Sequence, residues 1–556
     1  MKSAKNKFFL IALCGALLVG LLSAADSFFE LSKSIDLYAS VYKEVNNYYV
    51  DDVEPSKLMR TSIDGMLKTL DPFTNYFSTS QIENAKMQQG GKFGGLGIDI
   101  ELVNNLPVVI AVWQNQPADK AGVKVGDIIK SIDGASTKDK KKEDVERFLI
   151  GQPKSTVQLQ LERKVSLLDT KLVQLQLTRE EIQETNVPFF GMVNNEVGCI
   201  KLKIFNENAA KDVKSAFDSL KRAQPAMKGI ILDLRGNPGG LLIEAVNLVN
   251  IFIEKNQLVV TTKGKVSEWN NTFNTQNEPT DLKMPIVVIT NSMSASASEI
   301  VSGSFQDYDR GVVIGQRTYG KGLVQVTKPL SYNTMLKVTT AKYYIPSGRC
   351  IQALNYSEKN EDGSVKRIPD SLKVAFKTKN GRPVWDGGGV EPDVEMEKPT
   401  QSKLAATLIS KNYILDFATQ YTLQHPIIAE AGAFKLTAKD YEDFVVYVKR
   451  KDHSYKTETD DKLEALKTVS TEEKYYESLK TSLDAVQQKL SQIRAQELQT
   501  QKDEIITLLE NEIVGRYYYA YGKVKKSYQN DPEVAKAIEL LLDPTKFNEL
   551  LTVKSK

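Results

Sequence analysis

The chain has 556 residues, of which 41% are hydrophobic and 26% are charged, and its 73 basic and 70 acidic side chains leave a net charge of +3. This length suffices for about three or four domains, and such a composition is ordinary for globular protein. Because the two charge signs nearly balance, the composition gives no case for a polyanionic partner, and we expect no nucleic acid among the partners.

The N-terminus has the order of an export signal. Lysines at positions 2, 5 and 7 precede an apolar run, and small residues follow it just before Asp26. This order is typical of a signal peptide or an uncleaved membrane anchor over residues 1–25; a buried N-terminal helix is the alternative. We therefore expect an exported protein of the periplasm or cell envelope, tethered to the inner membrane if the segment is kept.

The three cysteines do not form a disulfide framework. Loss of the signal would remove Cys14 and leave Cys199 and Cys350, which is too few for a disulfide scaffold in a chain of this size. We expect two buried single thiols. Because there is no CxxC pair or Cys/His cluster, we expect no metal site.

The first 165 residues predict two kinds of structure. Residues 26–90 are expected to be helical up to Pro72, because apolar residues recur three to four apart in FFELSKSIDLYASVYKEVNNYYV. Residues 91–165 predict strands at GGLGIDIEL, LPVVIAVW and the alternating STVQLQLERK. A short amphipathic helix is predicted at KEDVERFLI.

The next part of the chain alternates strands with helices. GIILDLRG (229–236), PIVVITN (285–291) and GVVIGQ predict buried strands, and LLIEAVNLVNIFI (241–253) and the segment through SASEIVSGSFQDY predict helices. This alternation predicts a largely parallel sheet.

Residues 401–556 contain few strand signals. One apolar stripe recurs at three or four residues, as on one face of a long helix, and consists of Tyr476, Leu479, Leu483, Val486, Leu490 and Ile493. Helices that pack within their own domain or on a neighbour are the favoured interpretation, and a dimerising coiled coil is the alternative.

The histidine count restricts the chemistry. The whole chain has two histidines, His425 and His453, and both are far in sequence from the serine-rich stretch NSMSASASEI. A Ser-His-Asp triad would have to recruit one of them from another domain, so the sequence disfavours it. The same count disfavours Cys-His and His-metal mechanisms.

A lysine is the remaining base for a serine. A lysine has a reference pKa near 10.4, and burial can lower it by several units. Lys321 lies between Gly320 and Gly322 in TYGKGLVQ, beside two apolar strands. These glycines permit a tight backbone path that could turn the side chain inward; a surface hairpin lysine is the alternative.

Ser296 lies where a strand is predicted to turn into a helix, in VVITN-SMSA-SASEI. Such a junction exposes the hydroxyl and directs helix amides at a developing oxyanion. Helix capping is the alternative, and it is our interpretation for Ser292, Ser294 and Ser298. The loop DLRGNPGG (233–240) could supply further amides, and without a GKS or GKT ending it is not a P-loop.

Taken in order, FGGLGI, DLRGNPGG, SASASEI, QDY and TYGKGLVQ resemble the C-terminal processing peptidases, which are serine endopeptidases with a Ser/Lys dyad. The resemblance covers roughly residues 35–395 and includes GGGVEPDVEM (387–396). It implies a multidomain α/β fold, with a crotonase/ClpP-like α/β protease core and an inserted, β-rich PDZ domain. An N-terminal helical segment and a helical C-terminal domain complete it.

The expected divisions are an N-terminal helical region over 26–90, a PDZ domain over 91–165, a peptidase core over 166–400 and a helical domain over 401–556. The helical domain could form a homo-oligomer, bind an adaptor or shape access for unfolded chains.

The resemblance assigns roles at the active site. It implies Ser296 as nucleophile, Lys321 as general base and Gln325 as the residue that orients the lysine. The oxyanion would be bound by the amide of Ala297 and by a glycine amide of the loop. The candidate glycines are Gly239 and Gly240, and Glu299 and Asp307 match polar residues that support the dyad. No metal or cofactor is implied.

The PDZ resemblance implies a partner. A loop of Gly95, Leu96, Gly97 and Ile98 would bind the terminal carboxylate, and an apolar C-terminal tail of a protein substrate would add as a strand. In the family this domain also gates the active site. Two other functions fit parts of the sequence. One is a tail-binding scaffold or chaperone without cleavage, and the other is a crotonase-type enzyme that acts on a thioester.

Overall fold

The computed structural model describes residues 29–79, 81–82, 92–166, 169–360, 362 and 364–553. The expected signal over 1–25 lies outside them. The chain forms two compact units. The smaller consists of the residues up to Phe77 together with Thr327–Val338, and the larger of Ser78–Val326 and the chain from Thr339 onward. Across the described ranges, no helix is both long and apolar enough to cross a membrane.

The smaller unit is built from helices and a strand pair. A helix over 29–48 precedes α2 (Pro55–Lys68), and β1 (Asn75–Phe77) pairs antiparallel with β18 (Thr334–Tyr344). Pro55 occupies the first turn of α2, where its missing N–H costs nothing. The expected N-terminal helices are therefore confirmed within the described residues.

The PDZ domain is one antiparallel sheet in the order β3-β4-β5-β7-β8, with β6 on β5. The bounds are β3 (Ile98–Val103), β4 (Leu106–Val112), β5 (Ile128–Ile132), β6 (Ala135–Ser136), β7 (Thr156–Lys164), β8 (Thr170–Thr178), α4 (Pro117–Lys120) and α5 (Lys142–Leu149). The alternation in β7 buries Val157, Leu159 and Leu161.

The PDZ sheet runs past residue 165, where the sequence placed its end. Strand β8 pairs with β7 along its whole length, from Thr178 opposite Thr156 to Thr170 opposite Lys164. Its Leu177 is 3% exposed and packs in the domain's core. The chain then returns through β9 (Glu180–Gln183), which pairs with β2 (Lys92–Gly95). These two strands enclose the domain as an insertion.

The expected peptidase core contains a six-stranded sheet in the order β10-β11-β12-β15-β16-β23. Its strands are β10 (Phe189–Met192), β11 (Val197–Lys201), β12 (Gly229–Asp233), β15 (Ile286–Thr290), β16 (Val312–Gly315) and β23 (Val394–Glu395). Every neighbouring pair is parallel except β10 with β11. The carboxyl ends of β12, β15 and β16 therefore share one edge, and the glycine loop, the serine turn and the lysine loop all begin there.

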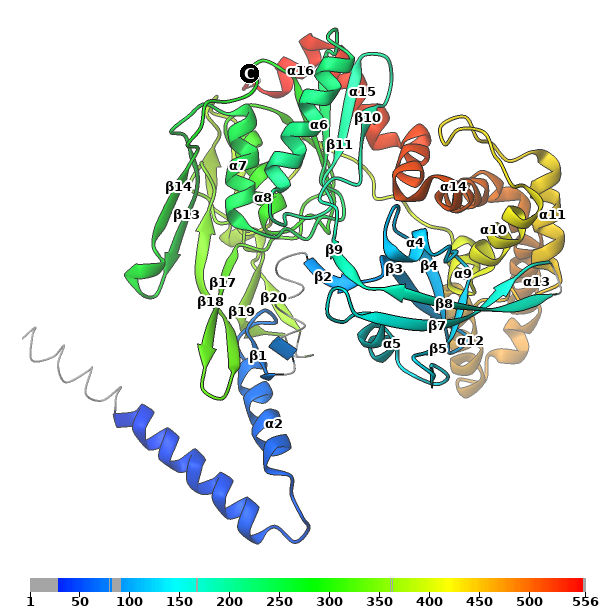
Figure 1. Ribbon diagram of the computed structural model, residues 1–556, viewed down its shortest axis with the longest axis horizontal. Helices are drawn as coiled ribbons and strands as arrows, with labels where there is room; N and C mark the ends of the chain where they lie inside the picture. Colours follow the sequence, from blue (N-terminus) through cyan, green and yellow to red (C-terminus); the bar gives the residue numbers. More distant parts are fainter. Residues whose placement is uncertain are drawn as a thin grey trace, which may run out of the picture. The chain divides into compact units, whose positions relative to one another are not determined.

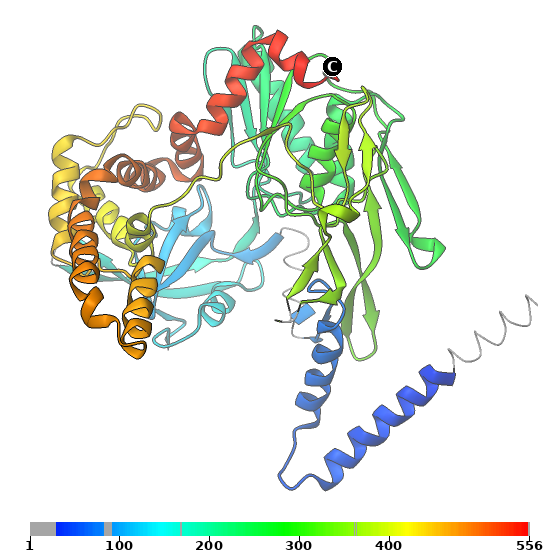
Figure 2. The ribbon, with the colours of Figure 1, turned by 180° about the vertical axis from the view of Figure 1, so that it is seen from behind.

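Helices cover both faces of this sheet. On one face are α6 (Ala209–Ala223), α7 (Leu242–Phe252) and α8 (Ala297–Asp307), which Figure 1 shows side by side. On the other face are α15 (Pro532–Leu542) and α16 (Pro544–Leu550), the red helices of Figure 2. Because both faces are buried, the central strands are continuous apolar runs rather than alternating ones.

A second sheet carries the strands after the lysine loop. Strand β18 pairs with β13 (Leu258–Gly264) and β17 (Leu323–Leu330), and β13 pairs with β14 (Asn271–Asn274). Short pairs complete the described strands: β19 (Leu354–Lys359), β20 (Val365–Arg367), β21 (Ala375–Lys377) and β22 (Pro383–Trp385). The described single-turn helices are η1 (Ser267–Trp269), η2 (Asp370–Leu372) and η3 (Tyr528–Asn530).

The expected helical domain over 401–556 divides in two. Its own apolar core joins helices α9 (Lys403–Ser410), α10 (Tyr413–Gln424), α11 (Ala438–Lys449), α13 (Tyr476–Thr500) and α14 (Lys502–Ser527), and α12 (Glu458–Glu472) packs on α13. Helices α15 and α16 instead belong to the core sheet, where Val534, Ala537 and Leu541 pack on strand residues.

The apolar stripe of the sequence lies on the single helix α13, as predicted, but it is not a buried face. Leu483 is 6% exposed, whereas Val486 is 46% and Ile493 is 49% exposed. The spacing of apolar residues therefore predicted a helix correctly, but it did not determine which face of that helix is buried.

Candidate active site

The serine turn joins β15 to α8. Ser296 immediately precedes α8 and has φ 55° and ψ −113°, a backbone conformation that costs free energy for a residue with a side chain. Ala295 and Ala297 are buried beside it, and Ser296 is half-buried. This is the strained strand-to-helix geometry that presents a nucleophilic hydroxyl.

Glu299 holds the serine turn and the lysine loop together. Its carboxylate is fully buried and accepts hydrogen bonds from the backbone amides of Ser296 (2.8 Å), Gly320 (2.7 Å) and Lys321 (2.9 Å), and from the Thr318 hydroxyl (2.6 Å). Burial raises the pKa of Glu299, and the four donors oppose that rise. Glu299 therefore bridges the serine turn and the lysine loop through its buried carboxylate.

The lysine loop is fixed by its backbone. The Gly322 amide donates to Gln352 Oε1 at 2.8 Å, and the Ala353 amide donates to the Gly320 carbonyl at 2.9 Å. Gly320 has φ +87°, and a Cβ there would lie 2.4 Å from the Cβ of Ala353. Only glycine fits this path, and Lys321 is half-buried between the two glycines.

Tyr343, to which no sequence pattern pointed, joins the serine turn to the lysine loop. Its hydroxyl lies 3.2 Å from the carbonyl oxygen of Ser296 and donates to the carbonyl oxygen of Lys321. Burial, and then the charge of Glu299, raise the pKa of Tyr343 well above 10.0, so the phenol stays a donor. No local motif marks this tyrosine, because β18 brings it to the site from beyond the β17–β18 hairpin.

Gln325 is the third residue of β17, the strand that follows the lysine loop. Its side-chain amide donates to Thr339 Oγ1 at 3.4 Å, and the residue is half-buried. The strand thus places it on the same segment as Lys321, and its orienting role stays a prediction.

The glycine loop lies directly against the serine turn. A Cβ at Gly239, which has φ +101°, would be 2.8 Å from the Cβ of Ser296 and 2.9 Å from the amide nitrogen of Ala297. The carbonyl of Asn237 accepts from the Ala295 amide at 3.0 Å. The loop and the turn are therefore one rigid structure, and glycine permits their close approach.

The amide of Gly239, one of the two expected loop donors, already has an acceptor. The Gly239 amide donates to the side chain of Asn237 at 2.8 Å, and Gly240 has φ +144°. Within the described part of the chain, the Ala297 amide has no acceptor. The oxyanion assignment to Ala297 with Gly239 or Gly240 stays a prediction.

Asp307 lies at the opposite end of α8 from Ser296. Its carboxylate pairs with Arg349 at 2.9 Å and accepts from the Ser347 amide at 2.9 Å. Burial raises the pKa of Asp307, and Arg349 opposes that rise. Asp307 therefore stabilises the packing of α8 through a buried ion pair.

The predicted carboxylate-binding loop precedes β3 in the PDZ domain. The carbonyl of Leu96 accepts from the Ala118 amide at 2.9 Å, and the carbonyl of Gly97 accepts from the Trp113 amide at 2.8 Å. Gly97 has φ +73°, and Ile98 begins β3. Gly95 ends β2, and Lys142 of α5 binds Glu101 of β3 at 2.8 Å.

The remaining candidate groups lie outside the site. His425 and His453 bind backbone carbonyls of their own segments, Tyr421 at 3.0 Å and Lys451 at 3.1 Å. Cys199 is a buried free thiol, as expected, whereas Cys350 is a free thiol that is only half-buried. Among the residues that the structure covers, no group of His, Cys, Asp or Glu could hold a metal ion.

Together, the serine turn, glycine loop and lysine loop meet at the carboxyl edge of a parallel sheet, which is the arrangement expected of a serine peptidase. Family models match three parts of the chain. Residues 196–357 match "Peptidase family S41", residues 94–178 match "PDZ domain", and residues 404–541 match "Probable PDZ-protease, C-terminal helical domain".

Curated relatives agree with this class. A carboxy-terminal-processing protease of Bartonella bacilliformis is 34% identical over 325 residues, which is 58% of this chain and 73% of the relative. A protein of Staphylococcus haemolyticus named "Probable CtpA-like serine protease" is 30% identical over 68% of each chain. The chain belongs to peptidase family S41, and it is a serine-type peptidase with a PDZ domain.

Solved structures give a weaker likeness. A photosystem II D1 C-terminal processing protease is 26% identical, covers 65% of this chain and 92% of its own, and has a TM-score of 0.35. The tricorn protease is 18% identical, covers 60% of this chain and 29% of its own, and has a TM-score of 0.30.

Proposed function

We propose that this peptidase binds apolar C-terminal tails of protein substrates in its PDZ domain and cleaves their peptide bonds with Ser296 and Lys321. The observation that carries the proposal is the buried Glu299 carboxylate, which binds the amides of both residues at 2.8 and 2.9 Å. One carboxylate thus fixes the two backbone segments that must meet for nucleophilic catalysis.

In the proposed mechanism, the neutral amine of Lys321 takes the Ser296 hydroxyl proton as the hydroxyl attacks the peptide carbonyl. The Ala297 amide and the amide of Gly239 or Gly240 stabilise the oxyanion. The lysine ammonium then donates its proton to the leaving amine, and water hydrolyses the acyl-enzyme. Each of these steps uses side chains and amides of this chain.

The PDZ domain supplies substrate selection in this proposal. A terminal carboxylate binds the amides of the 95–98 loop, and the tail pairs with β3 beside α5. Two relatives support tail processing by their names, the carboxy-terminal-processing protease and the D1 C-terminal processing protease. Comparing degradation of one protein that ends in apolar or in charged residues tests this selection.

We further propose that the protein acts in the periplasm or cell envelope, on precursors or damaged proteins. The charged–apolar–small order of residues 1–25 supports export. Fractionation of cells that express the full chain tests the location, and recovery in the cytosol alone would contradict it.

The catalytic assignment is tested by Ser296→Ala, Lys321→Ala and Lys321→Arg, with cleavage of a tailed protein followed by mass spectrometry. All three should lose at least about a thousandfold in kcat, and arginine should fail because it stays protonated. Ser292→Ala is the matched control, since Ser292 is an exposed serine of the same turn, and it should keep wild-type activity. Cleavage retained by purified Ser296→Ala protein would end the assignment.

A further inference from the structure

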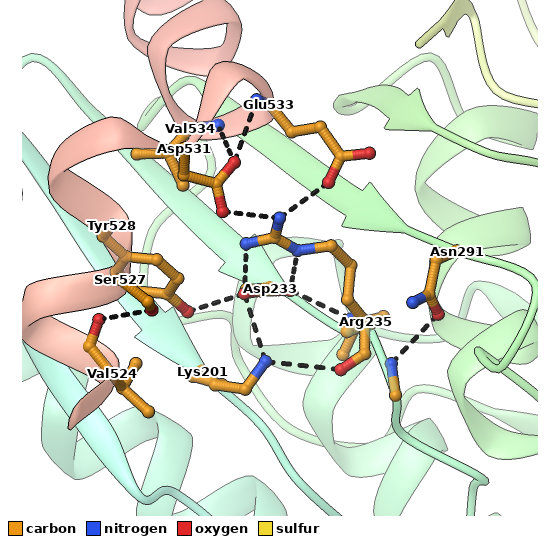
Figure 3. Close-up of polar contacts among 12 residues, drawn as sticks. Lys201, Asp233, Arg235, Asn291, Val524, Ser527, Tyr528, Asp531, Glu533 and Val534 are labelled. Atoms are coloured by element: carbon orange, nitrogen blue, oxygen red, sulfur yellow. Dashed lines mark hydrogen bonds and ion pairs between the residues drawn. The ribbon is translucent and has the colours of Figure 1, made fainter. Parts of the chain in front are cut away.

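Arg235 lies at the junction between the core sheet and the glycine loop. It follows β12 by two residues and precedes the loop glycine Gly236. Its guanidinium makes two bonds to Asp233, at 2.9 and 2.8 Å, and one nitrogen also donates to Asp531 at 2.7 Å and to Glu533 at 2.6 Å. Figure 3 shows the guanidinium between these carboxylates.

The two distal carboxylates come from the C-terminal segment, about 300 residues along the chain. Asp531 caps α15 by accepting from the amides of Glu533 and Val534, and Glu533 lies in the first turn of that helix. The segment is fixed at this place because Tyr528 donates to Asp233 at 2.6 Å (Figure 3) and α15 packs on the core sheet.

Glu533 also reaches the second catalytic loop. Its other carboxylate oxygen accepts a hydrogen bond from the side-chain amide of Gln316, the residue that follows β16. Gln316 precedes Lys321 by five residues, and Arg235 precedes Gly239 by four. One carboxylate therefore binds a residue near the start of the glycine loop and a residue at the start of the lysine loop.

The serine turn is tied into the same network. The amide of Gly236, directly after Arg235, donates to Asn291 Oδ1 at 3.0 Å, and Asn291 begins the turn that leads to Ser296 (Figure 3). A displacement of Arg235 would thus be transmitted to the glycine loop and to the serine turn.

The network is well desolvated. The side chains of Asp233, Glu533 and Arg235 are 0%, 3% and 16% exposed. Burial alone would raise the pKa of Asp233, but Arg235 and Lys201 hold it well below its usual range. Neutralising Glu533 removes one of the three carboxylates around Arg235, which keeps its bonds to Asp233 and Asp531.

We infer that Glu533, together with Asp531, is a positioning residue of the active site. The C-terminal segment supplies these carboxylates to hold Arg235 and Gln316, and so sets the geometry of the glycine and lysine loops. This inference rests on the proposed catalytic assignment. It makes the segment after α14 a part of the catalytic apparatus, with a role beyond covering the sheet.

The test compares Glu533→Gln with Glu539→Gln in the full chain. Both lie on α15, but the Glu539 carboxylate is about half exposed and faces Lys536 and Lys546. Each variant is assayed with a quenched peptide that ends in an apolar tail, and with a peptide aldehyde that adds to the serine hydroxyl and places its oxygen at the oxyanion position. Active-site titration and a melting curve give the folded fraction.

For Glu533→Gln we expect kcat to fall about tenfold and the aldehyde inhibition constant to rise by a similar factor, with KM within about twofold, since the loss is in the oxyanion geometry. Glu539→Gln should match the wild type in all three. Gln316→Ala, which removes only the hydrogen bond between Glu533 and the lysine loop, should give a smaller fall in kcat and serves if Glu533→Gln folds poorly.

Equal kcat and equal inhibition constants for Glu533→Gln and Glu539→Gln, per folded molecule, would overturn the inference. A rise in KM with unchanged kcat would overturn it as well. Ser296→Ala distinguishes a failure of this inference from a failure of the catalytic assignment. If that variant is inactive while Glu533→Gln is normal, only this inference fails, whereas turnover by Ser296→Ala removes the catalytic assignment and this inference with it.

Discussion

At the scale of single residues, the site depends on groups that bind backbone rather than substrate. Glu299 accepts from three amides and one hydroxyl, and Tyr343 lies against the carbonyls of Ser296 and Lys321. Such contacts fix the two reacting segments before a substrate arrives, and catalysis gains because little reorganisation remains.

Replacing Tyr343 with phenylalanine should lower kcat by about tenfold with little change in KM, because the hydroxyl that joins the two carbonyls is lost while the ring still fills its site. Steady-state kinetics measure the effect. Tyr344→Phe is the control: Tyr344 is its neighbour on β18, points to the opposite face and is half-buried. Equal kinetics for the two variants would show that the Tyr343 hydroxyl has no positioning role.

At the scale of elements, helix α8 connects Ser296, the proposed nucleophile, at its start to a buried ion pair at its end. Asp307 and Arg349 are each 1% exposed, and Asp307 also accepts the Ser347 amide. The pair is too far along the helix to touch the serine turn. Its function is to hold α8 against the chain that follows β18.

The ion pair predicts a stability effect without a catalytic one. Arg349→Leu should lower the free energy of unfolding by about 3–5 kcal/mol, because Asp307 is left buried without its partner. Lys214→Met, which removes an exposed pair with Asp218, should cost less than about 1 kcal/mol. Urea unfolding measures both. A fall in kcat per folded molecule in Arg349→Leu would contradict this division of roles.

At the scale of the whole molecule, the chain returns from its helical domain to complete the peptidase core. Helix α14 packs its first half in the helical domain and then leads to Tyr528, which packs under the core sheet. Its backbone leaves the helical region at Tyr519, at φ 54° and ψ −157°. Arg516, near this kink, donates to the carbonyl of Val125 in the PDZ domain at 3.2 Å. One helix therefore contacts all three parts of the larger unit.

The reactivity of the Cys199 thiol measures whether α15 covers the core sheet. Cys199 is fully buried on β11, facing α15, and burial raises its pKa far above the ordinary value, so it carries almost no thiolate. In protein with Cys14 and Cys350 changed to serine, native Cys199 should resist a maleimide, and denaturant should release one reactive thiol.

Leu541→Ala should speed labelling of native Cys199 by at least about tenfold, because the lost packing of α15 makes opening easier. Val486→Ala, at a half-exposed position of α13, is the control and should leave the rate unchanged. Rapid labelling of native Cys199 in the protein with Cys14 and Cys350 changed to serine, without Leu541→Ala, would show that α15 does not cover the sheet in solution.

The amino-acid sequence by itself determined the class of each segment and the chemistry available to it. Apolar period, the order of strands and helices, and the glycine-bounded loops are local properties, so the parallel core, the PDZ strands and the serine, glycine and lysine segments could all be predicted. The absence of a nearby histidine pointed to lysine for the same reason.

Only the tertiary structure decided which distant residues meet. Tyr343 reaches the site across a hairpin, Glu533 reaches Arg235 from about 300 residues away, and α15 covers a sheet that the sequence assigned to another domain. The course of β8 past residue 165 was likewise decided by its pairing with β7. These contacts arise because buried apolar faces and buried charges must find partners wherever the chain provides them, and no local pattern records where that is.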